Sequence, residues 1–179
     1  MEMFLTHKTF LHKVRQLNSP YWNEGAAYRW EYMSHAIDIM KKYKAAEICE
    51  AGASDIPLYS RSVLIEYTKR KVSGNMGPYL MGNKSYKHDL NYAPYPFVTK
   101  KFDFFVALQV WEHLDCQHIA FNEVKRISRH AILSFPYMWK HGDGRHRGID
   151  QARIARWTCG VKPVSIKQIR DRIVYVWKF

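Results

Sequence analysis

The sequence has few cysteines and no apolar run long enough to suggest a membrane span. Its three cysteines, Cys49, Cys116 and Cys159, are far apart, which gives neither a disulfide framework nor a paired metal-binding motif. A membrane-spanning helix needs about 18 consecutive apolar residues, and no stretch approaches that length. The segment Met1–Lys8 also lacks the apolar block of a secretory signal. We therefore expect a protein of a reducing, cytoplasmic compartment with no membrane partner.

Acidic residues are also scarce. The 179 residues include 16 Asp and Glu against 28 Lys and Arg, which gives a formal net charge of +12. Such a surplus says little about the fold but favours anionic partners, such as nucleic acid or phosphorylated sugars. A basic surface that is merely solvated is the alternative. Hydrophobic residues make up 47% of the chain and aromatic residues 15%, which indicates one well-packed domain.

Short runs rich in β-branched and aromatic residues predict seven strands. We expect them at residues 46–50, 62–67, 86–90, 102–108, 130–135, 162–166 and 172–179. The run 102–108 is apolar on both faces, which is typical of a central, parallel strand. The last two runs are separated by too few residues for a crossover helix, so they should pair antiparallel.

Helical signals alternate with these strands. The clearest lies at residues 26–44, where Trp30, Met33, Ile37 and Met40 are spaced by three and four positions. A shorter helix is predicted at residues 149–157, and another within residues 1–22. Pro57 leaves room for only a short helix before the second strand. Asp115 is expected to cap the helix that follows the fourth strand.

The order of these elements predicts an α/β fold with a doubly wound sheet. Within it, the stretch Ala45–Pro57 reads as a buried strand that ends at Glu50 and turns at Gly52. In open α/β sheets, ligands bind at the carboxyl ends of the strands. A glycine at such a turn lets the backbone approach a ligand, and a following helix offers unpaired N–H groups. This turn is therefore the expected centre of a binding site.

Three stretches, in this order, resemble motifs of the class I S-adenosylmethionine-dependent methyltransferases, in particular the small type 11-like domains. Glu50-Ala51-Gly52-Ala53 resembles the first motif. His88-Asp89-Leu90, followed by Pro94-Tyr95-Pro96-Phe97, resembles the third-strand motif. Phe102–Leu114, which ends in Glu-His-Leu, resembles the fourth strand. The resemblance spans residues 28–179. It implies a Rossmann-like, mostly parallel seven-stranded sheet with an antiparallel C-terminal strand pair, in a single domain at 26–179 preceded by a lid or extension at 1–25.

The resemblance also implies a site for the methionine portion of S-adenosyl-L-methionine. Glu50, Gly52 and Ala53 would surround that portion and the ribose edge, while Leu108 and Gln109 would line the same side from the fourth strand. Arg29, near the start of the first long helix, is a candidate partner for the cofactor carboxylate. Its aromatic neighbours Tyr21, Trp22 and Tyr28 could form a lid together with Arg29. The alternative is that these aromatic side chains pack against the sheet.

The nucleoside portion would be bound by the second and third strands. Glu66 is the candidate for the ribose hydroxyls, because carboxylates accept hydrogen bonds from vicinal hydroxyls. It lies only fourteen positions after Gly52, which implies an abbreviated first helix. Asp89 and Leu90 would recognise the adenine amino group through side-chain and backbone contacts.

Candidates for a general base are His113, Tyr137 and His141. His113 is the next-to-last residue of the fourth-strand motif, and the alternative is that it caps a turn. Tyr137 and His141 lie in the basic, aromatic segment 137–148. This segment is suited to binding an anionic acceptor, and the alternative is a solvated loop. His141 and His146 have no further ligand at suitable spacing, so no metal site is predicted. Cys49, inside a strand, is expected in the core.

The expected activity is methyl transfer from S-adenosyl-L-methionine to an unidentified small-molecule or polymeric acceptor, with an anionic acceptor favoured. The alternative is a non-catalytic, basic nucleic-acid-binding or scaffold domain on the same fold. A nicotinamide-dependent oxidoreductase is disfavoured because the Gly-x-Gly-x-x-Gly fingerprint is absent after the first strand. The oligomeric state is not indicated by the sequence.

Overall fold

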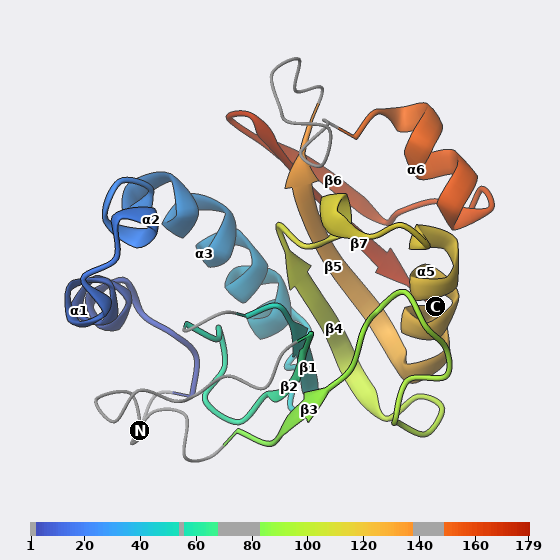
Figure 1. The fold of residues 1–179 in the computed structure, drawn as a ribbon, viewed down its shortest axis with the longest axis horizontal. Helices are drawn as coiled ribbons and strands as arrows, with labels where there is room; N and C mark the ends of the chain where they lie inside the picture. Colours follow the sequence, from blue (N-terminus) through green and yellow to red (C-terminus); the bar gives the residue numbers. More distant parts are fainter. Residues whose placement is uncertain (1–2, 54–55, 68–82, 138–148) are drawn as a thin grey trace.

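The computed structural model describes residues 3–53, 56–67, 83–137 and 149–179. They form an α/β domain around one seven-stranded sheet with the strand order β3-β2-β1-β4-β5-β7-β6 (Figure 1). The strands are β1 Ile48–Ala51, β2 Val63–Glu66, β3 Ser85–Lys87, β4 Phe102–Leu108, β5 Ser128–Pro136, β6 Ser165–Ile169 and β7 Arg172–Lys178. The first five are parallel, and β7 is antiparallel to both β5 and β6. The predicted fold class is thus confirmed.

Helices cover both faces of the sheet (Figure 1). One side carries α1 His7–Leu17, α2 Pro20–Asn23 and α3 Ala26–Lys42, and the other carries α5 Gln117–Ile127 and α6 Gln151–Thr158. A short 3-10 helix, η1 Trp111–His113, follows β4. None of the helices in the described ranges is both long and apolar enough to cross a membrane.

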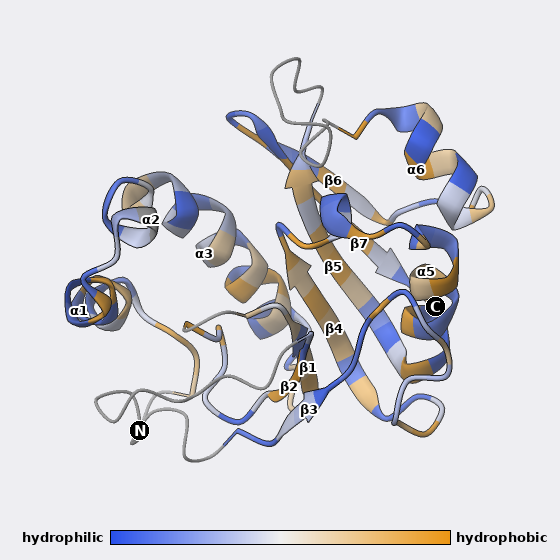
Figure 2. Cartoon of the chain, viewed as in Figure 1, coloured by the Kyte–Doolittle hydropathy of each residue, from blue (hydrophilic) through white to orange (hydrophobic). Residues whose placement is uncertain are grey.

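The core consists of two apolar layers, one on each face of the sheet. Along β4, Phe104 and Val106 belong to the layer under α1 and α3, whereas Phe105 and Ala107 belong to the layer under α5 and α6. This alternation follows from the two-residue period of a strand. Figure 2 shows the central strands as mainly hydrophobic and the outer helix faces as more hydrophilic. The prediction of a central, parallel strand at 102–108 is confirmed, and Cys49 is fully buried as expected.

The connection from β1 to β2 differs from the expected short helix. Residues 56–62 form turns and an isolated bridge, Phe4 with Tyr59, and no helix. Both oxygens of Glu50 accept backbone hydrogen bonds from this segment, from Leu58 N–H at 2.8 Å and Tyr59 N–H at 3.1 Å. The carbonyl of Leu58 in turn accepts from Leu5 N–H at 2.8 Å. These backbone groups are satisfied by the strand-end carboxylate and the N-terminal segment, so no helical hydrogen bonds are needed.

The start of α5 also differs from the prediction. Its N-cap is Cys116, which makes no side-chain cap, so Asp115 is not the cap. Instead Oδ1 of Asn91 accepts hydrogen bonds from the N–H groups of Asp115 and Cys116, each at 2.9 Å. The loop after β3 therefore satisfies the start of this helix, a role that local sequence does not reveal.

Candidate functional site

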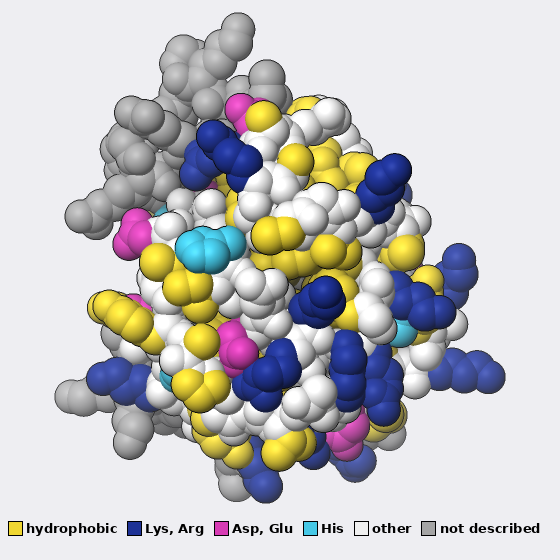
Figure 3. Space-filling model, turned by 90° about the vertical axis from the view of Figure 1, so that its right-hand side faces the viewer, with side chains coloured by type: hydrophobic (Ala, Val, Ile, Leu, Met, Phe, Trp, Pro, Cys, Tyr) yellow, Lys and Arg dark blue, Asp and Glu magenta, His cyan; other side chains and the backbone are white. Residues whose placement is uncertain are grey.

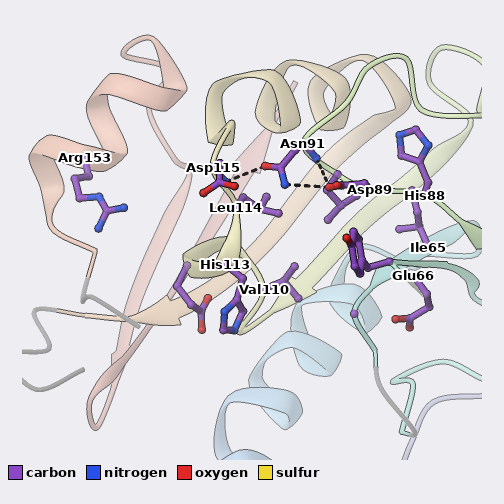
Figure 4. Close-up of a pocket in the computed structure, with 14 residues that line it drawn as sticks. Ile65, Glu66, His88, Asp89, Asn91, Val110, His113, Leu114, Asp115 and Arg153 are labelled. Atoms are coloured by element: carbon purple, nitrogen blue, oxygen red, sulfur yellow. Dashed lines mark hydrogen bonds between the residues drawn. The ribbon is translucent and has the colours of Figure 1, made fainter. Parts of the chain in front are cut away.

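A cavity of about 770 Å³ opens at the carboxyl ends of the parallel strands (Figure 4). Its lining comes from the ends of β1 and β2, the loop after β3, the segment after β4 and one residue of α6. The lining residues are Gly52, Ile65, Glu66, Tyr67, His88, Asp89, Leu90, Asn91, Val110, Glu112, His113, Leu114, Asp115 and Arg153. Ligand sites of open α/β sheets lie at this edge.

Gly52 directly follows β1 and lines this cavity. Its φ of +59° lies in the left-handed region, which residues with a side chain rarely adopt. A Cβ added there would lie 2.6 Å from Cγ2 of Val110, itself a lining residue. The glycine predicted from the sequence is therefore required both by the backbone conformation and by the close approach of the segment after β4.

Two carboxylates reach the cavity from neighbouring strands. Glu66 is the last residue of β2 and is only 8% exposed. Asp89 follows β3, and its Oδ1 accepts hydrogen bonds from the backbone N–H of Asn91 at 2.9 Å and from Asn91 Nδ2 at 3.0 Å. The side chain of Asn91 thus makes two kinds of contact: its Nδ2 donates to Asp89, and its Oδ1 accepts from the N–H groups at the start of α5. It therefore joins the wall of the cavity after β3 to the wall at the start of α5 (Figure 4).

A smaller cavity of about 130 Å³ lies next to Gly52, on the side of α2 and α3. It brings together the remaining predicted cofactor residues, Glu50, Ala53, Leu108 and Gln109, with Arg29. Arg29 is buried, and its guanidinium carbon lies 5.5 Å from the ring centre of Trp22. Gly52 lines both cavities, so the two spaces meet at the turn after β1.

Glu50 is fully enclosed beneath the smaller cavity. Burial is the main influence on this carboxyl group and raises its pKa to about 7, although two backbone N–H groups favour the charged form. Because both oxygens already bind Leu58 and Tyr59, Glu50 contributes to the site by fixing the loop between β1 and β2.

Gln109 follows β4 with a φ of +59°. Its backbone N–H donates to the carbonyl of Ser134 at 2.8 Å, and its Nε2 donates to Ser134 Oγ at 3.0 Å. These two bonds to β5 fix the point at which the chain leaves the sheet and enters η1. They hold the loop that carries Val110 and His113 over the cavity.

The three predicted general bases are placed differently. His113 is exposed and lines the larger cavity. Tyr137 lies beyond the end of β5, where its N–H donates to the carbonyl of Asp171, and it lines neither cavity. His141 lies outside the described residues. In the part of the chain that the structure describes, no three His, Cys, Asp or Glu side chains are arranged to hold a metal ion.

Several lining residues of the larger cavity were not predicted as site residues, and three of them matter most for its geometry: Asn91, Val110 and Arg153. Asn91 directly follows His88-Asp89-Leu90, so its position in that motif was the available signal. Val110 lies inside the fourth-strand motif, but its contact with Gly52 depends on the conformation after β4. Arg153 reaches the cavity only because α6 packs beside α5, which local sequence does not indicate.

Comparison with known proteins gives similarity of structure without similarity of sequence. No protein-family model matches the chain, and neither does any curated protein. Among solved structures, an S-adenosylmethionine-dependent methyltransferase from Clostridium acetobutylicum ATCC 824 has a TM-score of 0.68 at 9% identity, over 94% of this chain and 98% of that one. The N-methyltransferase NodS from Bradyrhizobium japonicum WM9, in complex with S-adenosyl-L-homocysteine, has a TM-score of 0.67 at 14% identity, over 94% and 97%.

Magnesium protoporphyrin IX methyltransferase (ChlM) from Synechocystis PCC 6803, with bound S-adenosyl-L-homocysteine, has a TM-score of 0.59 at 12% identity, over 88% of this chain and 86% of that one. The similarity extends over nearly the whole of each domain, and at these identities it concerns the fold. The chain has the Rossmann-like fold of the S-adenosylmethionine-dependent methyltransferases.

Proposed function

We propose that this protein binds S-adenosyl-L-methionine across the two cavities and transfers its methyl group to an acceptor, an activity of class EC 2.1.1. The observation that carries the proposal is the convergence of Gly52, Glu66 and Asp89 at the ends of successive parallel strands, around one cavity. The fold of the similar solved structures, two of which hold S-adenosyl-L-homocysteine, supports it.

The residues present fit this cofactor. A cavity of about 770 Å³ lies within the range of roughly 300 to 1,000 Å³ that small-molecule sites occupy. Glu66 and Asp89 supply acceptors for the ribose hydroxyls and the adenine amino group. The bare backbone of Gly52 leaves room beside the smaller cavity, where Arg29 supplies a cation for the carboxylate of the methionine portion.

When bound, the cofactor supplies a methyl group on a sulfonium, whose leaving group is already activated. The protein then has to position the acceptor and exclude water. Ile65, Leu90, Val110 and Leu114 are the aliphatic residues of the lining available for this. His113 is our candidate to take a proton from an acceptor hydroxyl or amine, because its exposed imidazole lies at the cavity, whereas Nε2 of the other lining histidine, His88, is bonded to the carbonyl of Tyr92.

The test is a calorimetric titration of S-adenosyl-L-homocysteine into wild type and an Asp89→Asn variant. The asparagine keeps Oδ1 as the acceptor for Asn91 but presents an amide in place of the second oxygen, so it should repel an amino group. We expect binding to wild type and roughly tenfold weaker binding to the variant. Asp38→Asn, at an exposed position of α3, is the matched control, and NAD is the control ligand. Absence of binding to wild type would overturn the proposal.

A second candidate function is nucleic-acid binding or scaffolding without catalysis. Lys100, Lys125 and Arg129 gather at the end of the sheet opposite the cavity, and burial together with the charges of Arg129 and Lys125 lowers the pKa of Lys100. Figure 3 shows many Lys and Arg side chains on the side of the molecule that carries α5 and α6. Oligonucleotide binding that falls steeply with salt, without binding of S-adenosyl-L-homocysteine, would favour this candidate.

A further inference from the structure

A third cavity of about 310 Å³ continues from the larger one between α5 and α6, and we call it the α5–α6 groove. It is lined by Asp115, Gln117, His118, Arg153, Arg156 and Trp157. Asp115 and Arg153 line both spaces, so the groove and the larger cavity meet at these two residues. Figure 4 shows Arg153 extending from α6 on the side of the cavity away from Glu66 and Asp89.

α6 holds two guanidinium groups at this groove on a firmly packed support. Arg153 and Arg156 are three residues apart, so they lie on the same side of the helix. The next residue, Trp157, is only 4% exposed, and its ring centre lies 5.7 Å from that of Trp111 and 5.3 Å from that of Phe121. This packing fixes α6 against the core, so the helix that carries the arginines does not have to become ordered when a ligand binds.

The charges of the groove suit an anion. Its two arginines outweigh its one acid, Asp115. Among the described residues, no carboxylate forms an ion pair with Arg153 or Arg156. The 11-residue helix α5 also begins here. Asn91 Oδ1 binds the N–H groups of Asp115 and Cys116 just ahead of its first turn, and the N-cap residue Cys116 adds no side-chain cap, so the positive end of the helix dipole adds to the potential of the arginines.

We propose that the α5–α6 groove binds an anionic group, a phosphate or a carboxylate, of the methyl acceptor. This rests on the proposed function, because a cofactor over Gly52, Glu66 and Asp89 leaves the Arg153 end of the cavity to the acceptor. Guanidinium groups match both anions with paired N–H donors. An acceptor held there extends past His113, with its nucleophilic atom in the larger cavity.

The test uses inorganic phosphate and succinate as separate probes, titrated into the protein with and without saturating S-adenosyl-L-homocysteine and followed by ¹H–¹⁵N NMR. We expect saturable shifts at the amides of Gln117 and His118 and at the indole of Trp157. The probe that binds with the higher affinity shows whether the groove prefers a phosphate or a carboxylate. Shifts confined to the region of Lys100 and Arg129, or binding of an oligonucleotide when neither small anion binds, would overturn the proposal.

The double variant Arg153→Gln/Arg156→Gln should bind the preferred anion at least roughly tenfold more weakly, because two charge-assisted contacts are lost. Lys162→Gln, an exposed cation just beyond α6, is the matched control and should bind it as wild type does. The affinity for S-adenosyl-L-homocysteine should be unchanged in Lys162→Gln and in the single variant Arg156→Gln, because Arg156 lines the groove and neither of the other two cavities. If wild type binds that cofactor product but the double variant binds the anion normally, the groove proposal fails while the proposed function stands. If wild type does not bind it at all, the proposed function fails, and the acceptor proposal fails with it.

Discussion

Glu50 shows how a single residue can be correctly located from sequence and still have an unexpected role. Its place at the end of a buried strand followed from the acid-turn-glycine pattern. Its hydrogen bonds to Leu58 and Tyr59 did not, because those N–H groups face it only when the chain after Gly52 folds back beneath the N-terminal segment. A carboxyl group so enclosed carries an energetic consequence that depends on pH.

We expect the stability of the protein to fall as pH rises through the titration of Glu50. Burial raises its pKa from 4.5 to about 7, so the folded state binds the proton more tightly than the unfolded state. The stabilising contribution is complete below 4.5 and declines by about 3 kcal/mol up to about pH 7. Urea unfolding of wild type and Glu50→Gln from pH 4 to 8 measures this contribution as the difference between their free energies of unfolding at each pH. Groups common to both proteins cancel, and a difference that does not change with pH would contradict the expectation.

Among the elements, those with a strong hydrophobic period were predicted well and those held by distant partners were not. The long helix α3 and the central strand β4 were both recognisable from their own residues. The edge strand β3 has only three residues, all exposed, and the actual strand ends two residues before Asp89. The cap of α5 was assigned to the wrong residue because the true acceptor, on Asn91, is 24 residues away from Asp115.

We predict that Asn91→Ala loosens both walls of the cavity. It removes the acceptor for the N–H groups of Asp115 and Cys116, which should cost about 1–2 kcal/mol of unfolding free energy. It also removes the Nδ2 donor to Asp89, so affinity for S-adenosyl-L-homocysteine should fall. Denaturant unfolding measures the first effect, and calorimetry measures the second.

Asn91→Asp separates these two effects, because it keeps an acceptor at the start of α5 but places a second carboxylate beside Asp89. It should retain most of the stability and still bind S-adenosyl-L-homocysteine more weakly. Asn23→Ala, at an exposed position in α2, serves as the control. Faster hydrogen exchange at Asp115 and Cys116 in the alanine variant alone would support the assignment. If these two amides exchange at the wild-type rate in Asn91→Ala, the proposed role of Asn91 at the start of α5 would be contradicted.

At the scale of the molecule, the mostly parallel seven-stranded sheet with an antiparallel C-terminal pair was predicted from the order of elements and motifs, and it is confirmed. The order of the strands within the sheet was not predicted, because it depends on which strands pair across the molecule. The division of the chain at residue 25 stays a prediction. The structure packs α1 into the same apolar layer as α3 and the sheet, and Phe10 is fully buried there, 5.3 Å from the ring centre of Trp30. Leu5 and Met3 also bond the segment after β1 through their backbones.

These contacts lead us to expect that residues 1–25 unfold together with the rest of the chain. Phe10→Ala should lower the global free energy of unfolding by about 3–5 kcal/mol, because it leaves a cavity in a layer shared with the sheet. Urea unfolding followed by tryptophan fluorescence and by far-ultraviolet circular dichroism should give coincident transitions with an unchanged denaturant slope. His12→Ala, exposed on the same helix, controls for helix propensity and should have little effect. A separate lid would behave otherwise: Phe10→Ala would advance only an early, partial transition and leave the main one in place. That result would support the division at residue 25, with residues 1–25 free to open and to carry Trp22 away from the smaller cavity.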